Sequence, residues 1–168
     1  RLVFEVRDED RDAITALLES HGIGRDDFIV CFQLGASETG KRWAPERFAG
    51  LARTLRAQRN ARILLVGVTE EASLGDAMLT AAPDSAIPLY GKTSVPQLAA
   101  LLERAGALVT NDTGTMHVAA AVGCPIALVS VGHVHYRETG PWGEGHCAIE
   151  RRREQLGRSD FVPGADEE

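Results

Sequence analysis

Five short apolar segments recur along the chain, and a stretch with helical periodicity separates each from the next. The apolar segments cover residues 28–34, 63–66, 87–90, 107–110 and 126–131. Helices are predicted over residues 8–20, 45–55, 70–82, 96–105 and 115–122. Strands that are apolar throughout are typical of a parallel sheet whose two faces are both covered. The sequence therefore predicts an α/β fold, a Rossmann-like parallel sheet with helices on both faces.

The length of 168 residues fits a single domain, since domains typically have roughly 100 to 200 residues. We expect residues 1–27 to form a linker and an initial helix, and residues 28–150 to form the Rossmann-like domain. Residues 151–168 lack periodicity and are expected to be a disordered tail. Because the chain begins at Arg1 rather than Met, we expect it to be a piece of a longer protein.

Acidic side chains outnumber basic ones by 24 to 18, which gives a formal net charge of -6. This balance argues against a general affinity for nucleic acid or for an anionic membrane, since both attract basic surfaces. The chain also has no run of ~18 apolar residues that could span a bilayer. We therefore expect no nucleic-acid partner and no membrane span.

The three cysteines, Cys31, Cys124 and Cys147, are odd in number and widely spaced. Such spacing fits no disulfide framework and indicates a reducing compartment. We therefore expect a cytoplasmic protein.

The segment from Gly35 to Lys41 resembles most of a P-loop and follows a predicted strand. A P-loop has Ser or Thr after its lysine to hold magnesium, whereas this chain has Arg42. The next helix also begins late, at Pro45. The sequence therefore argues against a nucleoside triphosphatase and leaves a basic residue at the mouth of the sheet.

Asp112, Thr113 and Gly114 spell the aspartic protease triplet. Aspartic proteases pair two such carboxylates so that they share one proton, and they do so in an all-β fold. Here the triplet leads directly into a predicted helix, which excludes a protease.

A zinc site is a further interpretation, based on His133, His135, His146 and Cys147. Their spacing follows no closed-site pattern, and histidines in loops are commonly just solvated. We therefore expect no metal and no cofactor.

Ligands of parallel sheets bind beyond the carboxyl ends of the strands, and the loops expected there cover residues 34–44, 67–71, 91–94, 111–115 and 132–141. These loops and the helix that follows residue 114 carry Lys41, Glu70, Glu71, Asp112, Thr113, Gly114 and His117. A glycine lets backbone approach a ligand, and the helix behind it exposes its first amides to an anion. The sequence therefore predicts a diphosphate site.

Each of these residues also has a purely structural interpretation. Asp112 can cap the following helix, and His117 can be an exposed polar side chain. Lys41 can be a solvated charge, and Glu70 or Glu71 can favour a helix start through the helix dipole. Their joint placement on consecutive loops favours binding.

The helix end alone is not sufficient for such a site. It contributes ~0.3 to 1 kcal/mol toward an anion, whereas micromolar binding requires about 8 kcal/mol. A charge-assisted hydrogen bond adds roughly 1.5 to 3 kcal/mol. Burial of a base and contacts to a sugar are expected to supply the remainder.

Several motifs in unbroken order between residues 28 and 145 resemble glycosyltransferase family 9, the ADP-heptose:lipopolysaccharide heptosyltransferase family. They are Gly35-Ala36-Ser37, Lys41-Arg42-Trp43, Pro45-Glu46-Arg47-Phe48, Gly91-Lys92-Thr93-Ser94 and Asn111-Asp112-Thr113-Gly114-Thr115-Met116-His117. The resemblance implies the C-terminal half of a GT-B glycosyltransferase, in which two Rossmann-like domains face each other. The C-terminal domain then holds the nucleotide-sugar donor, and the N-terminal domain holds the acceptor and the general base.

The resemblance also implies roles for single residues. Ser37, Lys41, Thr113 and Gly114 match positions at the donor diphosphate. Glu71, or its neighbour Glu70, matches the carboxylate on the ribose. Asp112 and His117 match positions near the sugar and the phosphate, and Gly91 and Thr93 mark the loop near the nucleotide base. Lys41, Asp112 and His117 are the implied catalytic residues, with Lys41 neutralising charge as the nucleotide leaves. Enzymes of this type use a cation and a helix end where others use a metal.

The sequence departs from the family pattern in three places. Ala44 stands where the family often has Pro, and His133-Val134-His135-Tyr136 replaces a Pro-Thr-Asp-Pro run. The pattern returns at residues 140–143, and Cys147 stands alone where the family commonly has a cysteine-rich motif. The second departure lies in a loop expected to face the donor sugar and the acceptor.

We therefore predict the donor-binding domain of an inverting, metal-independent glycosyltransferase. It would move a sugar, expected to be heptose, from a nucleotide diphosphate, expected to be ADP, to a lipopolysaccharide-type acceptor. The acceptor is expected to bind the N-terminal domain, and peripheral contact with the inner membrane is expected for the full-length protein. One alternative is a noncatalytic nucleotide-sugar binding or regulatory module, and another is an epimerase or hydrolase of similar fold.

Overall fold

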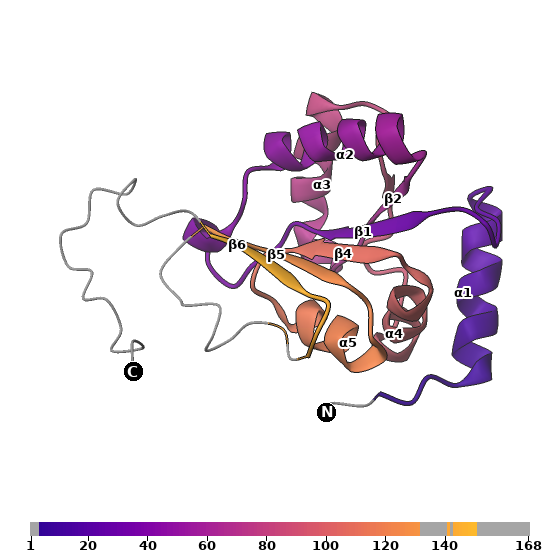
Figure 1. Ribbon diagram of the computed structural model, residues 1–168. Coiled ribbons are helices and arrows are strands. Elements are labelled where there is room, and N and C mark those ends of the chain that lie inside the picture. Colours follow the sequence, from indigo (N-terminus) through magenta and orange to yellow (C-terminus); the bar gives the residue numbers. More distant parts are fainter. Residues whose placement is uncertain (1–3, 132–140, 142, 151–168) are drawn as a thin grey trace, which may run out of the picture.

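The computed structural model describes residues 4–131, 141 and 143–150. Six parallel strands form one sheet in the order β3-β2-β1-β4-β5-β6 (Figure 1). The strands are β1 (Ile29–Gln33), β2 (Arg62–Leu65), β3 (Ile87–Pro88), β4 (Ala107–Thr110), β5 (Ile126–Ser130) and β6 (Cys147–Glu150). The predicted Rossmann-like parallel sheet is confirmed.

Helices cover both faces of this sheet (Figure 1). They are α1 (Asp8–Ser20), α2 (Pro45–Arg59), α3 (Ala72–Ala81), α4 (Val95–Arg104) and α5 (Gly114–Val122), with 3-10 turns η1 (Thr39–Lys41) and η2 (Thr69–Glu71). On one face α1, α4 and α5 enclose a core cluster, and on the other α2 and α3 enclose a second cluster. Ile14 and Leu18 of α1 are buried in the first cluster, so this helix packs into the core.

Local sequence signals account for where helices begin and end. Ser94 caps α4: its hydroxyl accepts a hydrogen bond from the Gln97 N–H at 3.3 Å, and the Gln97 side chain accepts one from the Ser94 N–H at 3.0 Å. Pro96 lies in the first turn, where its missing N–H leaves no helical bond unmade. At the carboxyl end of α2, Asn60 adopts the left-handed conformation with φ 49° and ends that helix.

Strand β1 lies at the centre of the sheet and is buried along its whole length. Its Phe32 ring contacts the ring of Phe48 on α2, with centroids 5.4 Å apart. Phe48 in turn meets the ring of Trp43 edge-on at 4.8 Å. These aromatic contacts tie α2, and the loop that leads into it, to the carboxyl end of β1.

Two elements differ from the predictions. The sheet has a sixth strand, β6, which no apolar run announces because it is short and lies at the edge, where Ile149 is 60% exposed. The helix expected over residues 70–82 begins as the turn η2, so α3 starts only at Ala72. Residues 151–168, expected to be a disordered tail, lie outside the described residues.

The strand order places a topological switch point between β1 and β4. After β1 the chain continues to one side through β2 and β3, and it then returns to the other side for β4, β5 and β6. Loops leave the carboxyl ends of β1 and β4 in different directions at such a point, and ligands of these sheets bind there. The sequence places the diphosphate site at this switch point.

Candidate functional site

Asn111 joins the loops on either side of the switch point. It follows β4, and its side chain is fully buried. Its Nδ2 donates hydrogen bonds to the Leu34 carbonyl at 2.8 Å and to the Gly35 carbonyl at 3.3 Å, while its Oδ1 accepts one from the Trp43 N–H at 3.0 Å. The loop after β1, the start of α2 and the turn after β4 therefore form one fixed unit.

Helix α5 begins beside this unit. Its N-cap residue is Thr113, not Asp112, and within the described part of the chain the Thr113 side chain makes no capping hydrogen bond. The Thr113 hydroxyl instead lies 3.3 Å from the hydroxyl of Thr110, a buried residue at the end of β4. A Cβ placed on Gly114 would meet no described atom within 4 Å. This end of the helix therefore presents open backbone with partial positive charge.

Lys41 carries its charge to the same place. Its ammonium group pairs with the Glu38 carboxylate at 2.9 Å, and its side chain is 19% exposed. The hydrogen bond to Glu38 raises the pKa of Lys41, and the nearby charge of Asp112 raises it further. The predicted cation therefore lies within electrostatic range of the start of α5. Because Glu38 is itself 66% exposed, an anion can compete for the same ammonium group.

Glu71 is the carboxylate that faces the strands. Its Oε2 accepts hydrogen bonds from the Gln33 amide and from the Val68 N–H, both at 3.2 Å. The same carboxylate lies against two glycines: a Cβ on Gly35 would overlap Oε1, and a Cβ on Gly67 would overlap Oε2. These contacts hold it beneath the loops after β1 and β2.

Glu70, the other acidic candidate, points away from this arrangement. It is exposed and has no hydrogen bond or ion pair among the described residues. The turn η2 thus distinguishes two adjacent glutamates that the sequence left equivalent.

Tyr90 packs beside Glu71 on the neighbouring strand connection. Its ring meets the space over Gly67 and Gly75, and its hydroxyl is buried with no partner among the described residues. Burial raises the pKa of Tyr90, and the charge of Glu71 adds to the effect. The tyrosine therefore stays neutral and forms an apolar wall behind the carboxylate.

The loop after β3 carries the remaining pair, Gly91 and Thr93. Gly91 has φ +66° and donates its N–H to the Gly67 carbonyl at 3.0 Å, which joins the loops after β2 and β3. A Cβ here would overlap the Thr69 hydroxyl. Thr93 is half-buried.

Ser37 and His117 are both exposed, and neither forms a hydrogen bond or ion pair with another predicted site residue in the part of the chain that the structure describes. His117 is the fourth residue of α5, close to the amino end of that helix. The structure thus brings Lys41 near Asp112 and fixes Glu71, but it shows no contact that joins Ser37 or His117 to them.

Sequence reasoning did not assign Asn111 and Gln33 to the site. Asn111 was part of a motif without a role, and Gln33 was read as part of an apolar strand. The signal that could have found both is a polar residue at the carboxyl end of a buried strand, since such a residue needs a hydrogen-bond partner. The partners themselves depend on which strands are neighbours.

The other functional interpretations find no support. Among the described residues no three His, Cys, Asp or Glu side chains are grouped as a metal site would need, while His133 and His135 lie outside those residues. The chain runs from Asp112 directly into α5, as expected, and α2 begins at Pro45, well after Lys41. Both observations argue against the protease and P-loop interpretations.

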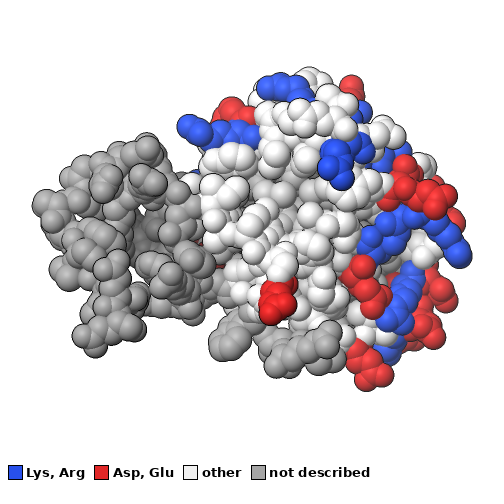
Figure 2. Space-filling view, in the orientation of Figure 1, with Lys and Arg blue, Asp and Glu red and all other residues white. Residues whose placement is uncertain are grey.

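Charged side chains of both signs share one side of the molecule. Figure 2 shows basic and acidic side chains interspersed over the side of the molecule that carries α1, beside a largely uncharged middle. In the described residues, none of the helices combines the length and the apolar character needed to cross a bilayer.

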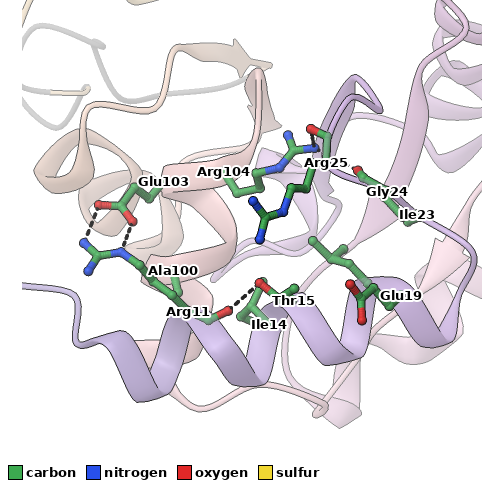
Figure 3. A pocket seen from close by; sticks show the side chains of 11 residues that line it. Arg11, Ile14, Thr15, Glu19, Ile23, Gly24, Arg25, Ala100, Glu103 and Arg104 are labelled. Atoms are coloured by element: carbon green, nitrogen blue, oxygen red, sulfur yellow. Dashed lines mark hydrogen bonds and ion pairs between the residues drawn. The ribbon is translucent and has the colours of Figure 1, made fainter.

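A hollow of about 290 Å³ lies away from the switch point, between α1 and α4 (Figure 3). At one end Arg11 forms a paired hydrogen bond with Glu103, at 2.7 and 3.0 Å. At the other, Arg104 donates to the carbonyls of Gly24, Arg25 and Asp27, which precede β1. The hollow therefore opens near the amino ends of the strands, opposite to the site described above.

The model of one protein family, "Glycosyltransferase family 9 (heptosyltransferase)", matches residues 4–158. Lipooligosaccharide heptosyltransferase 2 of Haemophilus influenzae is 36% identical over 103 residues, which are 58% of this chain and 30% of that protein. The chain thus spans less than a third of this curated relative.

Solved structures show the same relationship. A family 9 glycosyltransferase from Veillonella parvula superposes with a TM-score of 0.83 at 27% identity, over 88% of this chain and 42% of that one. The ADP-heptose lipopolysaccharide heptosyltransferase II of Escherichia coli does so with a TM-score of 0.76 at 25% identity, over 88% and 44%. On the match to the family model, which covers most of its length, the chain belongs to glycosyltransferase family 9, the heptosyltransferase family.

Proposed function

We propose that this chain is the donor-binding domain of an inverting, metal-independent glycosyltransferase that transfers heptose from ADP-heptose to a lipopolysaccharide-type acceptor. Similarity to an ADP-heptose lipopolysaccharide heptosyltransferase supports the donor and the acceptor class. In this proposal the chain is the C-terminal half of a GT-B enzyme, and it works in the cytoplasm. The acceptor binds a second domain, in peripheral contact with the inner membrane.

The observation that carries the proposal is the meeting of a cation and an open helix end at the switch point. Asn111 fixes the loop after β1 against the turn that precedes α5. Lys41 then lies within electrostatic range of Asp112. Asp112 precedes the backbone amides at the start of α5, which the Thr113 side chain does not cap. A diphosphate fits such a site because its charge is met by one ammonium group and several N–H donors.

Glu71 supplies the polar end for the nucleoside. A carboxylate held near the second strand of such a sheet accepts hydrogen bonds from ribose hydroxyls in many nucleotide-binding domains. Gln33 and Val68 hold Glu71 in this position. The nucleotide base then lies toward the loop that carries Gly91 and Thr93.

The transfer reaction depends on stabilising the negative charge that develops on the leaving group. When the bond between sugar and diphosphate breaks, negative charge develops on the departing phosphate oxygen. Lys41 and the α5 amides stabilise that charge where other enzymes use a metal ion. Asp112 and His117 lie close to the reacting sugar in this proposal. The attacking hydroxyl loses its proton to a carboxylate of the acceptor domain and bonds to the sugar carbon from the face opposite the departing diphosphate, and this single displacement gives inversion.

Thermal denaturation with ADP, UDP and GDP, each with and without EDTA, tests this function. A ligand at 100 times its Kd stabilises the folded state by about 2.7 kcal/mol, which for a domain of this size raises Tm by roughly 5 to 10 °C. We expect that shift with ADP and expect EDTA to leave it unchanged. If no nucleotide raises Tm, the binding proposal is wrong, and if EDTA removes the shift, metal independence is wrong.

A further inference from the structure

Gln33 is the one polar residue of β1. The other four residues of the strand, Ile29–Phe32, are apolar and at most 2% exposed, and Gln33 itself is 5% exposed. A buried polar side chain destabilises a fold unless its groups find hydrogen-bond partners. The amide of Gln33 therefore needs an explanation that packing does not give.

Only half of this amide is satisfied. Nε2 donates to Glu71 Oε2 at 3.2 Å, while Oε1 is buried and has no partner among the described residues. Turning the amide over would set its oxygen against the Glu71 carboxylate, so the nitrogen must face Glu71. A leucine of similar volume would remove the unpaired oxygen at no loss of packing. The amide is thus unfavourable for the fold alone, and its one hydrogen bond among the described residues is with Glu71.

The Glu71 carboxylate is held from several sides. Gln33 and the Val68 N–H both donate to Oε2, which uses about two of the four lone-pair positions of the carboxylate. The backbone of Gly35 lies close to Oε1, and that of Gly67 lies close to Oε2. Among the described residues Oε1 accepts no hydrogen bond, so this held carboxylate keeps one oxygen to accept hydrogen bonds from a ligand.

We propose that Gln33 is a positioning residue, which orients Glu71 to accept hydrogen bonds from the vicinal hydroxyls of the nucleotide ribose. This inference rests on the proposed donor-binding function and adds the group that determines selectivity for a ribonucleotide. Gln33 acts through Glu71 and touches no ligand itself. Its effect is therefore confined to the ribose hydroxyls and does not extend to the diphosphate.

Calorimetric titration of the protein with ADP and with 2′,3′-dideoxy-ADP separates these contributions. The ratio of the two Kd values measures the hydroxyl contacts, and we expect the parent to prefer ADP by about tenfold, equivalent to 1.4 kcal/mol. Gln33→Leu and Glu71→Gln are each expected to remove most of this preference while the Kd of dideoxy-ADP stays unchanged. Combining the two substitutions is expected to add nothing, since both break one interaction.

Ser85→Ala is the matched control, because it also removes a buried, unpaired polar atom, from the turn between α3 and β3. It is expected to leave both Kd values unchanged. Gln33→Leu is expected to melt at the parent's temperature or above. Should that variant fail to fold, Gln33→Met provides the same test with a flexible side chain.

The outcomes distinguish this inference from the function on which it rests. If Glu71→Gln loses the preference and Gln33→Leu keeps it, the role of Gln33 is overturned and the donor site stands. If Gln33→Leu weakens ADP and dideoxy-ADP equally, Gln33 is merely structural, and the inference is again overturned. If the parent binds neither nucleotide, the proposed function fails and the inference fails with it.

Discussion

The side-chain amide of Asn111 donates a 2.8 Å hydrogen bond to the carbonyl of Leu34, which joins the carboxyl ends of β4 and β1. These residues are 77 positions apart in the chain. Through this bond the two halves of the sheet are fixed at the point where the candidate diphosphate site lies. Site geometry and fold stability are therefore coupled at one residue.

Asn111→Ala is expected to lower the free energy of unfolding by on the order of 3 kcal/mol, because it leaves the buried Leu34 carbonyl and the part-buried Trp43 N–H without this partner. Urea denaturation measures this change. Gln58→Ala, on the exposed side of α2, is the control and is expected to stay within about 0.5 kcal/mol of the parent. A loss below about 1 kcal/mol for Asn111→Ala would contradict the central place of this side chain.

Glu38 and Lys41 give opposite predictions for nucleotide binding. In the parent protein the Glu38 carboxylate holds the Lys41 ammonium group and raises the pKa of Lys41. Glu38→Gln removes that carboxylate, so the ammonium group pairs more easily with a diphosphate. An ion pair whose carboxylate is largely exposed is weak, and we expect ADP to bind about two- to fivefold more tightly. Lys41→Ala is expected to weaken ADP by tenfold or more. Calorimetry at low salt measures both, and equal affinity in all three proteins would remove Lys41 from the site.

Gly35→Ala tests whether Glu71 reaches the ligand. A Cβ at this position overlaps Glu71 Oε1, the end of a flexible side chain, so the carboxylate turns away while the backbone stays in place. We expect ADP binding to weaken about tenfold and Tm to fall by roughly 2 to 8 °C, because the buried Gln33 amide loses its partner. Gly40→Ala, where a Cβ meets no described atom within 4 Å, is the control. Normal ADP affinity in Gly35→Ala would show that Glu71 does not reach the ligand.

Thiol reactivity tests the packing of the sheet. Burial raises the pKa of Cys124 to about 12 and raises the pKa of Cys31 as well, so at pH 8 neither forms the reactive thiolate. Their thiolates become populated only as pH rises toward those raised values. Cys147 is exposed. We expect the disulfide reagent DTNB at pH 8 to modify Cys147 in the folded protein, and all three thiols only in denaturant; fast modification of Cys31 would contradict the buried β1.

The elements that the sequence predicted well are those with a strong local signal. The helix expected over residues 8–20 and the strand over 107–110 have the same bounds in the structure. The apolar period of the first and the unbroken apolar run of the second depend on no distant contact. For β6 the signal is absent, because an exposed edge strand needs neither an apolar run nor alternation.

The site was predictable in its loops but not in its contacts. Lys41 and Asp112 each follow a strand, so the alternation of strands and helices was enough to place both at the carboxyl edge of the sheet. That their strands β1 and β4 are neighbours depends on the strand order. Which of Glu70 and Glu71 turns inward depends on the 3-10 turn η2, whose register no sequence pattern sets. The Gln33 and Asn111 contacts depend on the strand order around β1.

A crystal structure with bound ADP tests the central claim most directly, which is that a diphosphate lies between Lys41 and the open start of α5. The account predicts phosphate oxygens within hydrogen-bond distance of Lys41 Nζ and of backbone amides at Thr113 and Gly114, with the ribose at Glu71 and no metal ion between the phosphates. A diphosphate at any other edge of the sheet, or Lys41 still paired with Glu38 and turned from the ligand, would contradict it.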